Sequence, residues 1–147
     1  MKILIDTNIF IRALLDEHAQ ANLECRELFR LVNKQGIDFF TSDLVISEIV
    51  WVLTRFYGID KNTTIKYVKG ILSQNYKYIT NYNRQLALYY YSQYSAKYID
   101  CVLSSIDELQ KHEMIVVSYD KDFDKLGVVR KEPRQVIKEI KNQISKH

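Results

Sequence analysis

Short apolar runs alternate along this chain with longer segments in which apolar side chains recur at helical spacing. The runs Lys2–Asp6, Asp38–Thr41, Tyr76–Thr80 and Met114–Ser118 predict strands, and the last of these is the clearest. A shorter strand is predicted at Val128–Val129. Strands that alternate with helices are typical of an α/β fold with a parallel sheet. The pattern therefore predicts a central, mainly parallel sheet with helices packed around it.

Helical periodicity fills the segments between these strands. The predicted helices are Ile9–Leu15, Ala19–Lys34, Leu44–Tyr57, Lys61–Gln74, Arg84–Lys97, Ile99–His112 and a charged helix that runs from Pro133 to Ser145. Asn8 is expected to cap the first helix, and Gly36 to end the second. Ser42 or Asp43 is expected to cap the third.

Composition narrows the class of protein. The chain has 147 residues, of which 47% are hydrophobic, with four Gly and one Pro, so long flexible linkers are not expected. We predict one domain over residues 1–147, with a core at about 2–129 and a helical extension at about 133–145. Apolar stretches are too short for a signal peptide or a membrane span. Cys25 and Cys101 form no CxxC motif. These features predict a cytoplasmic protein without membrane contact, disulfide framework or zinc site.

Four carboxylates that are distant in sequence are predicted to meet at one edge of the sheet. Asp6 ends the first strand, and Asp120 follows the strand Met114–Ser118. Glu48 lies about one turn into the helix after the second strand, and Asp100 begins a helix. Ligands of open parallel sheets bind beyond the carboxyl ends of the strands. Because Glu48 interrupts an apolar segment, where an unpaired charge is costly, its presence favours a functional role.

Clustered carboxylates repel one another, and a hard divalent cation relieves that repulsion. Mg²⁺ prefers oxygen ligands and is commonly bound by one or two carboxylates together with a substrate phosphate, and Mn²⁺ accepts the same ligands. No His or Cys is placed to join the four acids, which disfavours zinc. A divalent cation activates water and stabilises charge on a phosphate. The acidic set therefore predicts hydrolysis at phosphorus. The net charge of +3 is compatible with a polyanionic partner without indicating one.

At these acids the sequence resembles the PIN-domain ribonucleases, and among them the toxin subunits of VapBC-type toxin–antitoxin pairs. The matching segments are Ile5-Asp6-Thr7-Asn8, Ile46-Ser47-Glu48-Ile49, Tyr98-Ile99-Asp100-Cys101 and Ser118-Tyr119-Asp120-Lys121-Asp122-Phe123. The resemblance covers the chain from about Lys2 to Val129. It departs from the family at Cys101, where many members have Ala, and in the long stretch after Pro133.

The resemblance implies a PIN-like α/β/α sandwich and assigns roles to individual residues. Asp6 and Asp100 would be the principal metal ligands, and Asp120 the fourth carboxylate of the metal site. Glu48 would bind the ion through water or help to deprotonate the attacking water. The supporting residues would be Asn8 and Ser118, which orient the site, and Asp122, which shares the role of Asp120 or braces its turn.

By the same resemblance, the chain would be a Mg²⁺- or Mn²⁺-dependent endoribonuclease that leaves a 5′-phosphate and a 3′-hydroxyl. It would act on RNA as a homodimer and as a toxin silenced by a small antitoxin protein. Two other functions stay open: a non-catalytic PIN-like module that binds RNA or protein, and a Mg²⁺-dependent phosphohydrolase for small phosphate esters. The latter normally needs a nucleophilic Asp-x-Asp on the first strand, where this chain has Asn8.

A cluster of tyrosines lies in and after the predicted helix Arg84–Lys97. Its members are Tyr89, Tyr90, Tyr91, Tyr94 and Tyr98. Such a cluster predicts a helix packed on a neighbouring element, or a dimer interface, where tyrosine is enriched. Stacking on nucleobases is the alternative.

Overall fold

The computed structural model describes residues 1–146, so the last residue of the predicted domain, 147, lies outside the described part. Across residues 1–146, five strands form one sheet in the order β3-β2-β1-β4-β5, and every neighbouring pair is parallel. The strands are β1 (Lys2–Ile5), β2 (Asp38–Ser42), β3 (Lys77–Ile79), β4 (Ile115–Val117) and β5 (Arg130–Lys131). The predicted α/β fold with a parallel sheet is confirmed.

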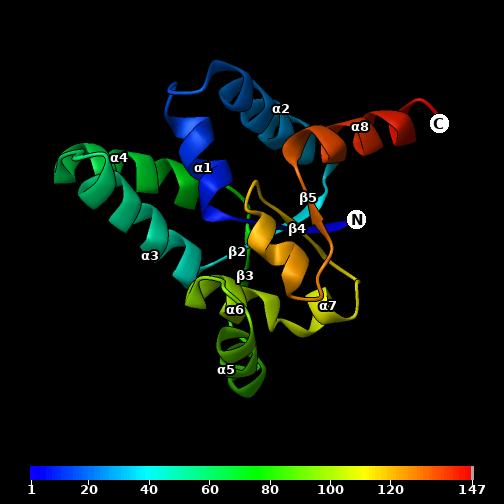
Figure 1. Ribbon diagram of the computed structural model, residues 1–147. Coiled ribbons are helices and arrows are strands. Elements are labelled where there is room, and N and C mark those ends of the chain that lie inside the picture. The colour runs from blue at the N-terminus through cyan, green and yellow to red at the C-terminus, as the bar shows by residue number, and fades with distance from the viewer. Residues whose placement is uncertain (147) are drawn as a thin grey trace.

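Helices flank this sheet (Figure 1). They are α1 (Thr7–Leu14), α2 (Ala19–Gln35), α3 (Asp43–Trp51), α4 (Lys61–Leu72), α5 (Arg84–Gln93), α6 (Tyr98–Ser104), α7 (Asp107–Gln110) and α8 (Pro133–Ile144). A π-helical segment, η1 (Val52–Phe56), continues α3, and a 3₁₀ segment, η2 (Lys121–Lys125), follows β4. Among the helices described, none combines the length and the apolar character that crossing a membrane requires.

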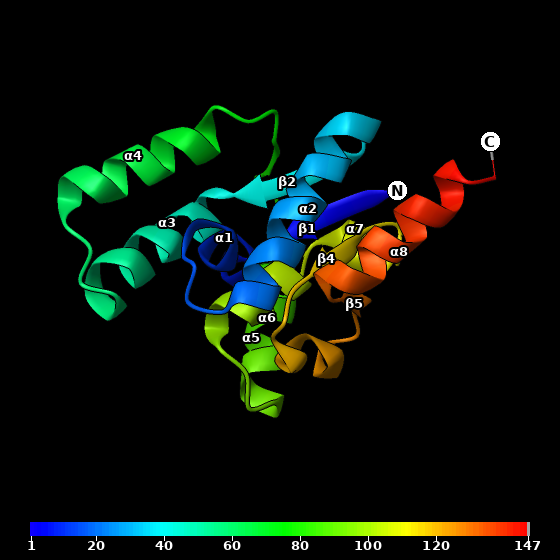
Figure 2. The same cartoon turned by 90° about the horizontal axis from the view of Figure 1, so that it is seen from above.

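The helices are grouped around the strands in a layered arrangement. In Figure 1, α2 packs against α1 and α8 above the strands, and α5 packs against α6 below them. The view from above shows α3 and α4 side by side, at the end of the molecule away from α8 (Figure 2). This arrangement confirms the predicted α/β/α architecture.

The central strands supply the middle of the hydrophobic core. Ile3, Leu4 and Ile5 of β1 are fully buried, as are Val116 and Val117 of β4. Strands that are covered on both faces are apolar along their whole length, which explains why both segments read as continuous apolar runs. Because Ile5 pairs with Val117, the residues that follow them emerge together at the carboxyl edge of the sheet.

The start of α1 differs from the prediction. Asp6 is the N-cap, and its side chain accepts a hydrogen bond from the backbone N–H of Thr7, so the helix begins at Thr7 rather than Ile9. The expected cap, Asn8, lies inside the first turn. Its side chain instead bonds to polar groups at the neighbouring strand end. Asp6 therefore has two local functions, because it ends β1 and begins α1.

Three further boundaries were predicted wrongly. The predicted helix Ile99–His112 is broken where Ile106 adopts an extended conformation with its side chain in the core, which separates α6 from α7. The predicted helix Arg84–Lys97 ends at Gln93, because Tyr94 is extended. The last strand lies two residues beyond Val128–Val129, where Arg130 pairs with Val116.

Candidate active site at the carboxyl edge of the sheet

Asp6 is fixed by hydrogen bonds from two neighbouring strand ends. Its Oδ1 accepts a hydrogen bond of 2.8 Å from the Thr7 backbone N–H. Its Oδ2 accepts one of 2.6 Å from the Ser118 hydroxyl and one of 3.0 Å from the Asn8 amide. The residue is only 2% exposed. Burial raises the pKa of Asp6 to about 6, although the hydrogen bonds from Ser118 and Thr7 partly offset it.

Ser118 joins three segments of the site through one hydroxyl group. Its Oγ donates to Asp6 and accepts hydrogen bonds of 2.9 Å from the Asn8 amide and 2.9 Å from the Asp120 backbone N–H. The side-chain oxygen of Asn8, Oδ1, accepts a further hydrogen bond of 3.3 Å from the Tyr119 backbone N–H. The structure thus places Asn8 and Ser118 in contact with each other and with Asp6, and Ser118 also in contact with the Asp120 backbone.

Glu48 reaches the same edge from α3. The helix begins at Ser42, whose hydroxyl accepts a hydrogen bond of 3.2 Å from the Val45 N–H, and Glu48 follows in its second turn. The Thr7 hydroxyl donates a hydrogen bond of 2.5 Å to Glu48 Oε2. Thr7 belongs to the matching motif, but nothing in the residue pattern predicts this contact. It connects the Glu48 carboxylate to the first turn of α1, beside Asp6.

Asp100 is the most deeply buried of the acids. It lies in the first turn of α6, its side chain is 1% exposed, and neither carboxyl oxygen accepts a hydrogen bond from the described residues. Burial, together with the negative charges of Asp6, Asp120 and Glu48, raises the pKa of Asp100 to about 8, against the opposing effect of Lys97. A buried carboxyl group without hydrogen bonds is costly and needs an explanation.

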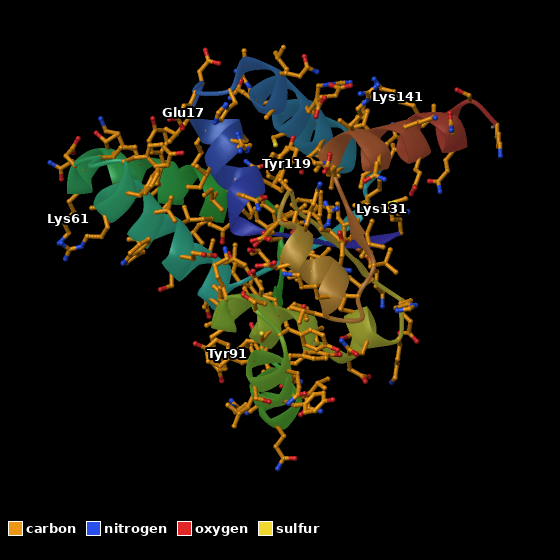
Figure 3. The ribbon with its side chains drawn as sticks, in the orientation of Figure 1. Glu17, Lys61, Tyr91, Tyr119, Lys131 and Lys141 are labelled. Carbon is orange, nitrogen blue, oxygen red and sulfur yellow. The ribbon has the colours of Figure 1, made fainter. Side chains whose placement is uncertain are left out.

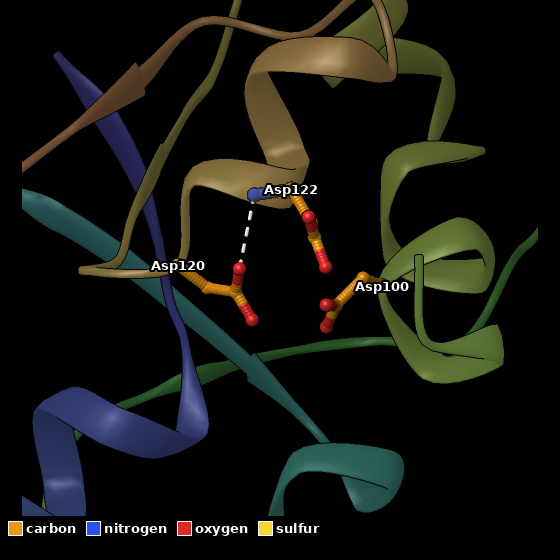
Figure 4. A group of neighbouring side chains, drawn as sticks. All are labelled: Asp100, Asp120 and Asp122. Atoms are coloured by element: carbon orange, nitrogen blue, oxygen red, sulfur yellow. Dashed lines mark hydrogen bonds between the residues drawn. The ribbon is translucent and has the colours of Figure 1, made fainter. Parts of the chain in front are cut away.

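Asp120 and Asp122 lie opposite Asp100 (Figure 4). The turn after β4 is closed by a hydrogen bond of 2.9 Å from the Asp122 backbone N–H to Asp120 Oδ1. One carboxylate oxygen each from Asp100, Asp120 and Asp122 lies within 4.8 Å of the other two. The sequence left the role of Asp122 open beside that of Asp120, and the structure places both carboxylates next to Asp100. Asp6 is not part of this three-residue group.

Lys97 is the residue that sequence reasoning missed. Its Nζ lies 3.4 Å from Asp120 Oδ2, 3.8 Å from Glu48 Oε1 and 3.9 Å from Asp100 Oδ2. It occupies the N-cap position of α6, three residues before Asp100. That spacing on a helix start was the available signal, because residues three apart face the same side of a helix. Lys97 supplies positive charge to acids from three separate elements.

The group of three aspartates fits a hard divalent cation. All of its donor atoms are carboxylate oxygens, which are the ligands that Mg²⁺ and Mn²⁺ accept. The two Asp100 oxygens, buried and without hydrogen bonds, are the groups that such an ion would satisfy. His and Cys, the typical ligands of zinc, are absent from this group of described side chains.

A cleft of about 280 Å³ opens beside the acids, between α1 and α3. Its lining includes the charged side chains of Asp6, Glu48 and Lys97 and the exposed apolar side chains of Trp51 and Phe56. The cleft therefore combines charged groups that can hold a phosphate or an ion with exposed apolar side chains that can contact a partner or substrate.

Comparison with known proteins gives a family and a related structure. The family model for the PIN domain matches residues 3–129. A search of the curated proteins finds no match. The crystal structure of PAE2754 from Pyrobaculum aerophilum is similar with a TM-score of 0.67 and 12% sequence identity, over 97% of this chain and 96% of that chain. At this identity the likeness shows a shared fold.

Proposed function

We propose that this chain, which belongs to the PIN domain family, is a metal-dependent endoribonuclease that hydrolyses RNA phosphodiesters. PIN domains have a nuclease-type fold and are generally metal-dependent nucleases. The observation that carries the proposal is the Asp100 carboxyl group, which is buried, accepts no hydrogen bond from residues 1–146 and faces Asp120 and Asp122. Such an arrangement is costly unless a cation joins it.

In this proposal Asp100 and Asp120, from the group of three aspartates, hold the ion, and Asp122 supports Asp120. Asp6 lies outside that group, but its negative charge acts on Asp100, and we propose it as the third ligand. When bound, Mg²⁺ or Mn²⁺ lowers the pKa of water and stabilises negative charge on the reacting phosphate. Asn8 and Ser118 orient the Asp6 carboxylate through the hydrogen bonds described above.

The other two side chains at the mouth of the site have complementary charges. Glu48 is oriented by Thr7 and lines the cleft, so its carboxylate can take a proton from the attacking water. Lys97, at the same mouth, can contact a substrate phosphate.

The proposal is tested by cleavage of a labelled single-stranded RNA. Asp6→Asn and Asp100→Asn are expected to reduce cleavage to background, and EDTA is expected to do the same to the unaltered protein. Asp107→Asn is the control, because Asp107 is 72% exposed and pairs with Lys111 away from the site. Cleavage that persists in EDTA, or in both site variants, would show that the mechanism is wrong.

The two other functions make different predictions. A non-catalytic binding module should give no heat of Mn²⁺ binding in calorimetry, whereas the nuclease should bind the ion. A phosphohydrolase of small esters should hydrolyse p-nitrophenyl phosphate and leave RNA intact. The structure disfavours the latter, because Asn8 stands at the position of a nucleophilic second Asp and its amide is bonded to Asp6 and Ser118.

The biological setting is proposed from the resemblance to VapBC-type toxins. We infer a toxin that acts as a homodimer and is silenced by a small antitoxin. The exposed Trp51 and Phe56 in the cleft lining support this by offering an apolar surface for a partner segment. A single domain and a cytoplasmic location stay predictions of the sequence. Co-purification with the product of a neighbouring short reading frame would test the antitoxin.

A further inference from the structure

The tyrosines of α5 and α6 are mostly exposed, contrary to a simple packing role. Tyr90 alone among the five is buried, and its hydroxyl donates a hydrogen bond of 2.9 Å to Gln110 Oε1. Tyr91 is 52% exposed and Tyr98 48%. Figure 3 shows Tyr91 at the outer surface of this pair of helices. The packing interpretation therefore accounts for Tyr90 and leaves the other four side chains unexplained.

Three of these exposed rings line one recess. Tyr91, Tyr94 and Tyr98 surround an open, shallow hollow of about 590 Å³, which we call the tyrosine recess. The rings of Tyr91 and Tyr98 meet edge to face, with centroids 5.4 Å apart and planes at 79°. This contact orients both rings, and each remains about half exposed.

The tyrosine recess is continuous with the acidic site. Lys97 and Asp122 belong to its lining, and both also contact or join the acids around Asp100. Lys125 lies at its rim, where Nζ is 2.8 Å from Asp122 Oδ1 and 3.2 Å from the Ser95 carbonyl oxygen. The ammonium group of Lys97 therefore lines the recess, and that of Lys125 is bonded to two residues of its lining; both are paired with carboxylates of the site.

We propose that the tyrosine recess is a stacking site for an unpaired nucleobase of the RNA, next to the phosphate that is cleaved. This inference rests on the proposed ribonuclease function and adds how the substrate is bound. Proteins that bind single strands combine aromatic rings, on which bases stack, with cations that follow the backbone. Both components are present here within one surface. The recess thus selects for single-stranded RNA, because a base held in a duplex cannot stack on it.

A second copy of the chain is the competing occupant, and the geometry disfavours it. A partner seated on Tyr91 and Tyr98 would also cover Lys97 and Asp122, which belong to the same lining. It would thus obstruct the acids at which the substrate must arrive. A nucleobase on the same rings has the opposite effect, because it brings its own phosphate towards them.

The test measures binding of a single-stranded RNA that contains the fluorescent base 2-aminopurine, in EDTA so that no metal-dependent cleavage occurs. Wild-type protein should bind and quench the fluorescence, since stacking quenches this base. Tyr91→Ala and Tyr98→Ala should each weaken binding by about tenfold and abolish the quenching. Tyr91→Phe and Tyr98→Phe should retain both, because the ring and not the hydroxyl does the stacking.

Tyr89→Ala is the matched control, because Tyr89 lies on the same helix, is 56% exposed and is not part of the recess lining. It should bind RNA within about twofold of the wild-type affinity. Equal losses in the Tyr89 and Tyr91 variants would overturn the proposal, as would absence of RNA binding by the wild type. Sedimentation velocity tests whether a second copy of the chain occupies the recess. If Tyr91→Ala dissociates a dimer and leaves RNA binding unchanged, the surface is a dimer interface.

The same assays separate this inference from the proposed function. If the wild type cleaves RNA and the tyrosine variants bind it normally, the stacking site is wrong and the ribonuclease stands. If the wild type binds RNA through Tyr91 and Tyr98 but does not cleave it in Mn²⁺, the stacking site stands and the ribonuclease is wrong.

Discussion

Lys97 Nζ lies 3.4 Å from Asp120 Oδ2, and the same ammonium group lies within reach of Glu48 and Asp100. Partial burial alone would lower the pKa of Lys97, but the surrounding carboxylates outweigh it and the pKa is raised. Lys97 therefore stays charged. It gives the acids a counter-ion of their own, at the place where a divalent cation would have to join them.

The first prediction concerns this competition between Lys97 and the metal. In Lys97→Met the repulsion between ammonium and divalent cation is lost, so the dissociation constant of Mn²⁺ should fall by about fivefold. The metal-free variant should unfold at a lower temperature than the wild type, because three acids lose a positive neighbour. Calorimetric titration and thermal unfolding in EDTA measure the two effects.

Lys111→Met is the control for that prediction, since Lys111 pairs with the exposed Asp107 on α7. It should leave both the Mn²⁺ affinity and the unfolding temperature close to those of the wild type. Unchanged Mn²⁺ affinity in Lys97→Met would mean that Lys97 moves away without cost and is no competitor.

The second prediction separates Asp100 from Asp6 by stability. At about pH 9, above the raised pKa of Asp100, Asp100→Asn removes a buried charge that accepts no hydrogen bond from the described residues, so the metal-free protein should unfold at a temperature a few degrees higher. Asp6→Asn should instead destabilise the fold by about 1–3 kcal/mol. Asp6 Oδ2 accepts hydrogen bonds from Asn8 and Ser118, and an amide NH₂ group in its place cannot accept them. Thermal unfolding in EDTA would decide, and stabilisation by both variants would show that the Asp6 network is unimportant for folding.

The third prediction is a pH dependence of the metal-free protein. Folding raises the pKa of Asp100 to about 8 and that of Asp6 to about 6, from the ordinary value of 3.8. Between pH 3.8 and about pH 8 the folded state therefore binds more protons than the unfolded state, so the stability of the fold decreases as the pH rises. In EDTA the unfolding temperature should be lower at about pH 8.5 than at about pH 5.5, by several degrees.

Two comparisons sharpen that measurement. Asp100→Asn should flatten the dependence, because the group with the larger shift no longer titrates. Saturating Mn²⁺ should reverse it, because the ion binds the ionised carboxylates and so stabilises the fold more at high pH. An unfolding temperature in EDTA that rises steadily over the same range would contradict the raised pKa values.

Much of the fold and the acidic set could be predicted from the sequence. The buried strands β1 and β4 are apolar along their whole length, and the parallel order then places Asp6 and Ser118 at the same edge. These inferences depend on local pattern and on a general rule of topology. That is why they succeed without knowledge of any particular side-chain contact.

The features that sequence reasoning missed depend on contacts between distant segments. Lys97 is one of many lysines in the chain, and what distinguishes it is the convergence of acids from α3, α6 and the turn after β4. The break at Ile106 likewise reflects the need to bury that side chain in the core, which overrides helical periodicity. Asp6 caps α1 because its carboxylate lies beside the Thr7 N–H, a choice between Asp6 and Asn8 that spacing alone does not make.

The last prediction tests whether Ser118 positions the acids. Ser118→Ala removes a donor to Asp6 and an acceptor for Asn8 and the Asp120 backbone, so it should cost about 1–3 kcal/mol of stability. Cleavage should fall by about 10–100-fold, and the Mn²⁺ affinity should fall with it, because the metal ligands lose their orientation. Ser73→Ala, an exposed serine bonded to the Gly70 carbonyl, is the control. A stability loss with unchanged Mn²⁺ affinity would make Ser118 structural only.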